Sequence, residues 1–193
     1  MKLSIGVMGS SGGALSEDAR RKAYLLGEAI AEREAVLITG GCPGLPYEAV
    51  RGARAKGGLV IGISPGLSVD EHRGKYASPV DGFDVLIYTG SGLMGREITN
   101  IRSCDMVVIA GGRTGTLGEL AIAYDEGRLI GVLTGTGGIT SLVEEIVRVS
   151  GKDTGARVVY DDDPVRLIER LLTVYKTEHF RKPSCFCDSR TAG

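Results

Sequence analysis

The sequence has almost no net charge, and this disfavours a nucleic-acid partner. Its 23 Lys and Arg residues nearly balance 24 Asp and Glu residues, leaving a formal net charge of -1, whereas proteins that bind phosphate backbones usually carry a clear basic excess. The apolar segment at 1–8 is too short for a signal peptide, and no small-residue cleavage site follows it. We therefore expect a cytoplasmic protein without nucleic-acid or membrane partners.

Histidine is scarce, and this limits catalysis by a serine–histidine pair. The two histidines, His72 and His179, lie in an expected loop and in the C-terminal tail. Ser10 and Ser11 lack the sequence pattern of the turn that presents a nucleophilic serine. The pattern therefore argues against a serine hydrolase.

Cysteine is also infrequent, and its spacing is a weak metal signature. The chain has four cysteines, Cys42, Cys104, Cys185 and Cys187. Only the last two lie close together, and a Cys-x-Cys pair without partners at zinc-like spacing is rarely a site. Weak metal binding by this pair with nearby His179 is an alternative to a frayed terminus. We expect no metal site and predict a flexible C-terminal tail over residues 177–193.

Glycine, in contrast, is abundant. The chain has 30 glycines against six prolines, which indicates many tight turns in a folded chain and not disorder. With 42% hydrophobic residues, its 193 residues can bury one sizeable core. We predict a single domain over residues 1–176.

Short apolar runs alternate with amphipathic segments along this domain. The predicted strands are 3–8, 36–39, 59–63, 85–88, 106–110, 129–133 and 157–160. The predicted helices are 17–32, 47–56, 94–102, 116–126, 141–149 and 164–175. This βαβ alternation predicts an α/β fold, a Rossmann-like doubly wound parallel sheet with helices on both faces. Ligands of such sheets bind beyond the carboxyl ends of the strands.

The most informative turn, at residues 111–116, follows the strand at 106–110. It leads into a helix that carries Glu119 about one turn in. The first N–H groups of such a helix lack intrahelical partners, and the helix dipole is positive there, so the turn suits a phosphate. Glu119 would then point at a sugar. The alternative is a plain tight turn followed by a helix with an ordinary acidic residue.

Three further glycine clusters, at 9–13, 40–44 and 89–92, also follow predicted strands. With the turn at 111–116 they would form one polar rim. The first cluster lacks the full G-x-G-x-x-G spacing, and the strand at 59–63 ends without an acidic residue for a ribose. A nicotinamide-dependent dehydrogenase is therefore disfavoured.

Two motifs resemble the signatures of the Lonely guy family, a group also labelled "possible lysine decarboxylase". Residues 111–119, GGRTGTLGE, are similar to its PGGxGTxxE signature. Arg96, Arg102 and Asp105 match the order and spacing of its second signature. The serine pair after the first strand and the glycine pair after the second extend the resemblance over roughly residues 3–168.

The resemblance implies a homodimer that hydrolyses the N-glycosidic bond of a nucleoside 5'-monophosphate to base and ribose 5-phosphate, without a cofactor. It assigns catalysis to Arg96 and Glu119. A carboxylate can stabilise an oxocarbenium-like sugar or activate water, while a guanidinium orients the ribose or the carboxylate. The residues expected at the phosphate or nucleotide are Gly9, Ser10, Ser11, Gly40, Gly41, Arg102, Gly112, Arg113, Thr114, Gly115 and Thr116. A salt bridge between two helices is the alternative role for the catalytic pair.

Three departures from the family pattern point to a second function. Arg113 replaces a glycine of the phosphate turn, where it could bind the phosphate or block the site. Glu97 replaces a lysine, and the loop at 41–46 differs from the family's glycine run. These features resemble the subgroup that includes molybdenum cofactor carrier proteins. Because Arg96 and Glu119 are retained we favour an enzyme, with a carrier of molybdenum cofactor or another phosphorylated ligand as the alternative.

The decarboxylase label itself is disfavoured. Pyridoxal chemistry requires a lysine that forms a Schiff base in the pocket, and no lysine lies within the glycine-rich strand ends. Lys56 and Lys75 are the nearest, and we predict that both lie on the surface.

One long connection and two amphipathic helices bear on access to the site and on oligomeric state. Residues 65–83 are predicted as an irregular segment, either a mobile flap over the site or a plain surface excursion. The helices at 94–102 and 116–126 have apolar faces that a two-fold mate could cover. A homodimer or a higher homo-oligomer is therefore expected.

Overall fold

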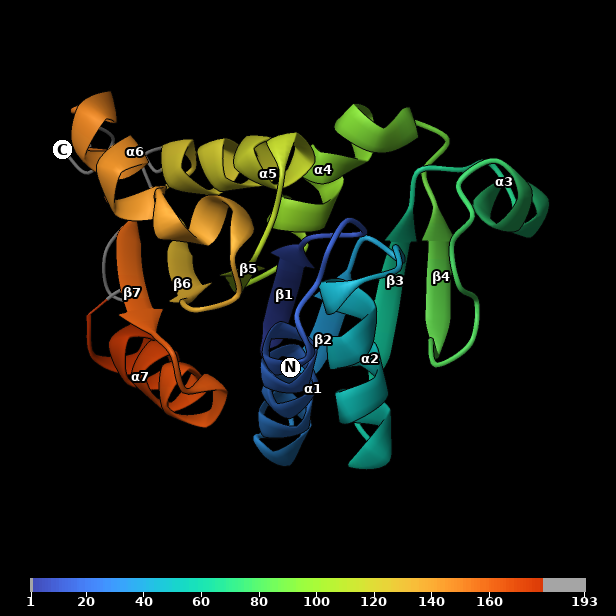
Figure 1. The fold of residues 1–193 in the computed structure, drawn as a ribbon, viewed down its shortest axis with the longest axis horizontal. Coiled ribbons are helices and arrows are strands. Elements are labelled where there is room, and N and C mark those ends of the chain that lie inside the picture. The colour runs from blue at the N-terminus through green and yellow to red at the C-terminus, as the bar shows by residue number, and fades with distance from the viewer. Residues whose placement is uncertain (1, 179–193) are drawn as a thin grey trace, which may run out of the picture.

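The computed structural model describes residues 2–178, and a seven-stranded, all-parallel sheet forms its centre (Figure 1). The strands lie in the order β4-β3-β2-β1-β5-β6-β7. Their bounds are β1 (Ser4–Gly9), β2 (Val36–Thr39), β3 (Val60–Ser64), β4 (Val85–Tyr88), β5 (Met106–Ala110), β6 (Leu129–Leu133) and β7 (Arg157–Asp161). The predicted α/β fold with a doubly wound parallel sheet is confirmed.

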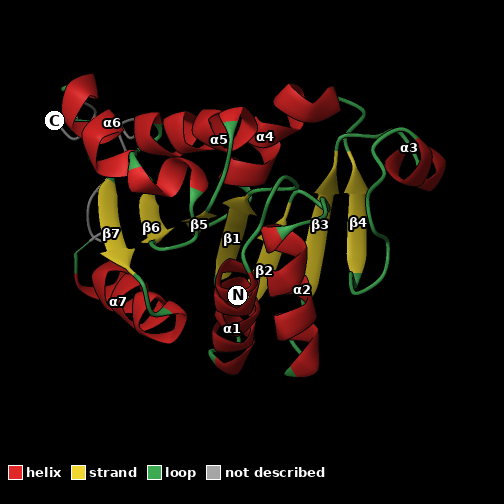
Figure 2. Cartoon of the chain, in the orientation of Figure 1, coloured by secondary structure: helices red, strands yellow, loops and turns green. Residues whose placement is uncertain are grey.

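Helices cover both faces of this sheet (Figure 2). The helices are α1 (Glu17–Glu32), α2 (Leu45–Ala55), α3 (Val69–Gly74), α4 (Gly92–Arg102), α5 (Thr114–Asp125), α6 (Val143–Ser150) and α7 (Pro164–Thr177), with a short 3-10 turn, η1 (Gly138–Ser141). One core cluster joins the sheet to α1, α2 and α7. The other joins it to α4, α5 and α6. The domain is therefore a three-layer sandwich.

Strand β5 shows why these strands are continuously apolar. Met106, Val108 and Ala110 point into the first core cluster, whereas Val107 and Ile109 point into the second. Successive side chains of a strand alternate between the two faces, so a strand covered on both sides must be apolar at every position. None of the five is measurably exposed.

The direction in which the chain adds strands reverses between β1 and β5. From β1 the chain moves outward through β2 and β3 to β4, and then returns to place β5 on the other side of β1. Gly9 and Ala110 are paired at the carboxyl ends of these two strands. The loops that follow diverge there, and this is where an open parallel sheet binds ligands.

The predicted helix boundaries lie close to the observed ones, but two elements of the structure were not predicted. Helix α1 is as predicted, and α2, α4 and α5 begin two residues earlier than expected. The interpretation of 65–83 as wholly irregular was wrong because it contains α3, whose N-cap Ser68 accepts a hydrogen bond from the Glu71 N–H. The turn η1 was also missed. Mobility of this segment stays a prediction, and the predicted tail lies almost wholly outside the described residues.

His72 lies on α3 and not in a loop, and it is fully buried. Its Nδ1 lies 2.8 Å from Ser64 Oγ, and its Nε2 lies 2.9 Å from the carbonyl oxygen of Pro79. The ring thereby joins the end of β3 to the far side of the segment at 65–83. Within residues 2–178, no helix has both the length and the apolarity to span a bilayer.

Candidate functional site

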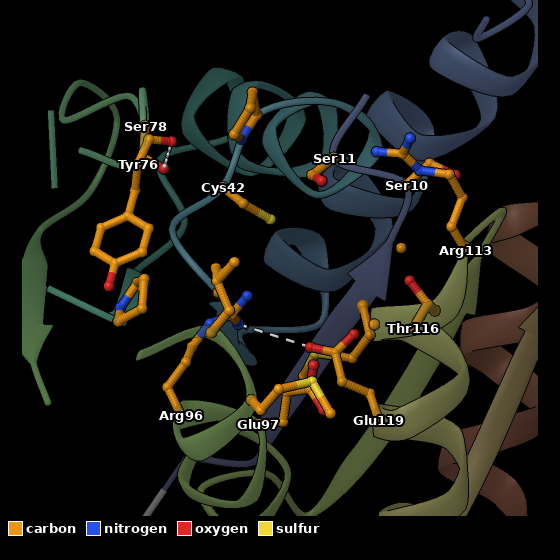
Figure 3. Close-up of a pocket in the computed structure, with 18 of the residues that line it drawn as sticks. Ser10, Ser11, Cys42, Tyr76, Ser78, Arg96, Glu97, Arg113, Thr116 and Glu119 are labelled. Carbon is orange, nitrogen blue, oxygen red and sulfur yellow. Dashed lines mark hydrogen bonds and ion pairs between the residues drawn. The ribbon is translucent and has the colours of Figure 1, made fainter. Parts of the chain in front are cut away.

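A cavity of about 780 Å³ opens at the carboxyl ends of the strands (Figure 3). Loops after β1, β2 and β3 contribute to its wall, together with α4 and the start of α5. It lies beside the point where the strand order reverses. Cavities of roughly 300–1,000 Å³ are typical of small-molecule sites. The structure therefore has room for a nucleotide-sized or pterin-sized ligand.

Most residues predicted for the site do meet around this cavity. Those that line it are Gly9, Ser10, Ser11, Gly40, Arg96, Arg113, Thr114, Gly115, Thr116 and Glu119. They come from segments as much as 110 residues apart, and the parallel topology brings them together. The cluster at 89–92 does not line the cavity, although the next two residues, Leu93 and Met94, do.

Three predicted residues are not among those that line the cavity. Arg102 is exposed at the end of α4, where its Nε donates to Glu126 Oε1 at 2.7 Å. Gly112 already uses its N–H, which donates to Ser10 Oγ at 2.6 Å. Gly41 adopts a left-handed φ of 64° and lies against the His72 ring. Gly41 and Gly112 therefore shape the loops of the site, whereas Arg102 joins the end of α4 to the end of α5.

The start of α5 forms the most suitable anion site of the cavity. Arg113 is the N-cap and makes no side-chain capping bond, and the first helical hydrogen bond runs from the Leu117 N–H to the Arg113 carbonyl. The preceding N–H groups, of Thr114 to Thr116, therefore have no acceptor in the helix. Figure 3 shows Arg113 beside the Ser10–Ser11 loop at the rim of the cavity. Its charge adds to the anion site, and the cavity remains open beside it.

Arg96 and Glu119 face each other on the cavity wall, as the dashed line in Figure 3 marks. Arg96 Nη1 lies 3.6 Å from Glu119 Oε1, and only 7% and 6% of the two residues are exposed. The guanidinium lies directly on Gly40, because a Cβ at that position would be 1.8 Å from Nη1. Nε and Nη1 of Arg96 are buried without a hydrogen-bond acceptor. A buried cation with unused donors is costly unless an anion binds it.

Burial raises the pKa of both carboxyl groups near Arg96. Burial raises the pKa of Glu119 to about 7, while Arg96 opposes this shift and Glu97 adds to it. Asn100 donates a long hydrogen bond of 3.5 Å to Glu119 Oε1. Burial also raises the pKa of Glu97 above its usual range. Glu119 can therefore take up or release a proton near neutral pH.

Sequence reasoning missed several residues of the cavity wall. Glu97 is only 4% exposed and packs against Gly118 of α5, where a Cβ would approach its Oε2 to 2.8 Å. Cys42 and Tyr76 also line the cavity. Lys75 lines it as well, although its side chain is 62% exposed, as a surface residue. The sequence contained one sign of this contact. Gly118 lies about one turn after Gly115 on α5, and two glycines on one face of a helix indicate that another segment, here the one with Glu97, packs closely against it.

No cluster of three or more metal-ligating side chains occurs among residues 2–178. Arg113 and the start of α5 lie at one side of the cavity and Tyr76 at the other (Figure 3), and the Lys75 ammonium lies 5.2 Å from the centroid of the Tyr76 ring. The arrangement can bind an organic phosphate. It can also move a proton through Glu119.

The chain is similar to proteins that bind molybdenum cofactor. It is 30% identical to the molybdenum cofactor binding protein of Rippkaea orientalis, with a TM-score of 0.74 and coverage of 90% of this chain and 98% of that one. For the molybdenum cofactor carrier protein of Chlamydomonas reinhardtii the identity is 28% and the TM-score 0.71, covering 89% and 99%. An uncharacterized protein of Archaeoglobus fulgidus is 39% identical over 134 residues, 69% of this chain and 82% of that protein.

The family follows from a match over nearly the whole domain. Residues 2–168 match the SLOG cluster4 family. The predicted resemblance to molybdenum cofactor carrier proteins agrees with the solved structures, whereas closer kinship to the Lonely guy enzymes stays a prediction. The chain belongs to the SLOG cluster4 family.

Proposed function

We propose that this protein binds molybdenum cofactor, a phosphorylated pterin that carries molybdenum, and holds it without turnover. The observation that supports this most directly is the buried Arg96, whose unpartnered Nε and Nη1 lie at a cavity of about 780 Å³. An anion in that cavity would supply the missing acceptors. The near-complete overlap with solved molybdenum cofactor binding proteins makes this cofactor the ligand of choice.

The phosphate is assigned to the first turn of α5. Free N–H groups of residues 114–116 and the positive end of the helix dipole stabilise a dianion there, and Arg113 adds a charge. Ser10 instead uses its Oγ to hold Gly112 in place. The pterin then extends toward Tyr76 at the far wall, where the Lys75 ammonium lies 5.2 Å from the ring centroid and can donate to the polar edge of the pterin.

Hydrolysis of a nucleoside 5'-monophosphate is the second candidate, because one observation favours it. Glu119 has a pKa raised to about 7 and lies beside Arg96, as a residue that activates water or protonates a leaving group requires. We favour the carrier for two reasons. Glu119 is only 6% exposed, and the Arg96 guanidinium that it faces keeps two nitrogen donors without an acceptor.

One binding experiment tests the carrier. Molybdenum cofactor released anaerobically from a purified molybdoenzyme is mixed with the protein, and the protein fraction from gel filtration is assayed for molybdenum and for oxidised pterin fluorescence. We expect about one of each per chain. Arg113→Gln should weaken binding about 5-fold to 10-fold, the effect of one exposed charge on a phosphate. Arg148→Gln, on the far surface of α6, is the matched control.

A parallel incubation tests the enzyme. A panel of nucleoside 5'-monophosphates is incubated with the protein, and free base is separated by chromatography. The carrier predicts no release of base. Release that disappears in Glu119→Gln would replace the carrier by a phosphoribohydrolase.

We also propose that the protein forms a homodimer through α4 and α5. Leu93, Met94 and Ile98 of α4 and Leu117 of α5 are exposed by 38–69%. Burying such a patch against a two-fold mate would stabilise the pair. Light scattering coupled to gel filtration should give twice the chain mass, and Met94→Lys should reduce it to one.

A further inference from the structure

Cys42 is a free thiol in the wall of the cavity. It follows β2, between Gly41 and Pro43, and it is neither fully buried nor exposed. Figure 3 shows its side chain directed into the cavity, near the Arg96–Glu119 pair. Burial raises the pKa of the Cys42 thiol, while the neighbouring Arg96 guanidinium opposes that shift. The wall of the cavity therefore includes a thiol whose sulfur can contact a ligand.

Arg96 provides a second and independent sign of a ligand at this point. Its side chain is 9% exposed, and Nε and Nη1 have no acceptor. The guanidinium rests on Gly40, two residues before Cys42, so the donors and the sulfur occupy the same part of the wall. Glu119 Oε1, at 3.6 Å from Nη1, is too distant for a hydrogen bond.

A thiol and unused guanidinium donors together select a particular kind of ligand. A bare metal cation is disfavoured, because Arg96 adds positive charge and no cluster of three ligating side chains exists within residues 2–178. A metal that arrives with its own ligands and carries oxo groups satisfies both features. Cysteine sulfur is a common metal ligand in proteins and can complete the coordination of such a metal, and oxo groups accept hydrogen bonds from guanidinium.

We propose that Cys42 Sγ ligates the molybdenum of the bound cofactor, while Arg96 donates hydrogen bonds to its oxo groups. This inference rests on the proposed function. The exchange replaces a metal-bound hydroxide: the S–H bond and the metal–hydroxide bond break, a metal–sulfur bond forms, and the thiol proton leaves with the hydroxide as water. The oxidation state of the metal does not change.

X-ray absorption at the molybdenum edge of the loaded, full-length protein tests the proposal. The number of sulfur neighbours is compared between the wild type, Cys42→Ala and Cys42→Ser, each checked for cooperative thermal unfolding. We expect one sulfur neighbour fewer in both variants. Cys104→Ala is the matched control, because Cys104 is 2% exposed in the second core cluster and does not line the cavity. The Cys185→Ser/Cys187→Ser double variant controls for the other two thiols.

The outcomes separate the two proposals. Retained cofactor with the same sulfur count in the wild type and both Cys42 variants would overturn the role of Cys42 and leave the carrier intact. Loss of the sulfur in the double variant but not in the Cys42 variants would also overturn it. Failure of the wild type to retain molybdenum and pterin would overturn the carrier, and with it this inference.

Discussion

Two arginine–carboxylate clusters lie at the carboxyl ends of strands in this molecule, and they differ in how completely the charges are paired. At the end of β7, Arg166 bonds to both oxygens of Asp161, with contacts of 2.6–3.0 Å, and Arg170 adds another at 3.0 Å. At the cavity, Arg96 and Glu119 are 3.6 Å apart, and two guanidinium nitrogens have no acceptor.

The pKa directions of the two carboxyl groups record the same difference. Hydrogen bonds from Arg166 hold the pKa of Asp161 well below its usual range. Burial instead raises the pKa of Glu119 to about 7. Satisfied hydrogen bonds make the Asp161 cluster favourable for the fold, whereas unused buried donors at Arg96 cost free energy in the fold alone and are satisfied if a ligand binds. The contrast supports a structural cluster at β7 and a functional one at the cavity.

Replacing the arginine of the cavity gives the largest expected effect. Arg96→Met should lower affinity for molybdenum cofactor about 100-fold, roughly 2.7 kcal/mol, by removing charge-assisted hydrogen bonds. The free energy of unfolding of the protein without cofactor should stay nearly constant, because the poorly paired buried cation is lost and Glu119, whose pKa Arg96 lowers, then takes up a proton in place of a buried charge. Pterin fluorescence titration and urea unfolding measure the two quantities.

The corresponding change in the structural cluster should do the reverse. Arg166→Met should destabilise the fold and leave affinity unchanged, since Arg166 is not among the residues that line the cavity. If Arg96→Met keeps its affinity and unfolds more easily, the functional reading of the cavity pair is wrong.

The pH dependence of stability should have opposite signs for the two carboxyl groups. The folded state holds the Glu119 proton more tightly than the unfolded chain, because the pKa rises from 4.5 to about 7. The free energy of unfolding should therefore fall between about pH 4.5 and pH 7, by about 1–3 kcal/mol. Urea unfolding at several pH values measures it, and Glu119→Gln should remove most of the fall. A profile unchanged by Glu119→Gln would contradict the assigned pKa.

Gly40→Ala should alter the ligand site more than the fold. The new Cβ would displace the flexible Arg96 guanidinium and not backbone, so affinity should fall about 10-fold, roughly 1.4 kcal/mol, with little change in thermal unfolding. Gly12→Ala is the control on the neighbouring loop, where the Cβ meets only Arg113 Nη2 at 3.7 Å. Equal effects of the two variants would exclude a specific role for the Gly40 contact.

The smallest effect is expected from the satisfied cluster. Asp161→Asn should lower the free energy of unfolding at pH 7 by about 1 kcal/mol, because its exposed arginine partners are screened by water. The contribution is present above the unfolded pKa of about 3.9 and is lost as pH falls below it. Stability curves of the variant and the wild type should therefore converge in acid. Divergence there would show that Asp161 acts by packing.

The sheet was predictable because its physical causes are local. Strands covered on both faces must be apolar throughout, and the chain has seven short runs suited to that environment. Helix α1 was located to the residue because Ser16 caps it and an acidic first turn follows. Helix α3 was missed although Ser68 and Glu71 form a capping pattern, because six residues carry too little hydrophobic periodicity.

The cavity was predictable only in part, because its composition depends on topology. Gly9 and Thr116 could be placed at strand ends from the sequence, and both line it. Cys42 and Glu97 were not assigned to it, although Gly40 and Arg96 of the same two segments were, because no local pattern shows which neighbours of an assigned residue also face the cavity. Gly112 was assigned to phosphate, but its N–H donates to Ser10, a contact across 102 residues that no local pattern reveals.

The buried imidazole of His72, in the segment at 65–83, makes changes in the cavity wall unusually easy to observe. The sequence contains two histidines and no tryptophan, so the ring resonances of His72 stand nearly alone in a nuclear magnetic resonance spectrum. Its nitrogens contact Ser64 and Pro79, and its Cε1 lies beside Gly41. Any rearrangement of the wall around a ligand alters the chemical shift of that one ring, which provides an intrinsic reporter without an added label.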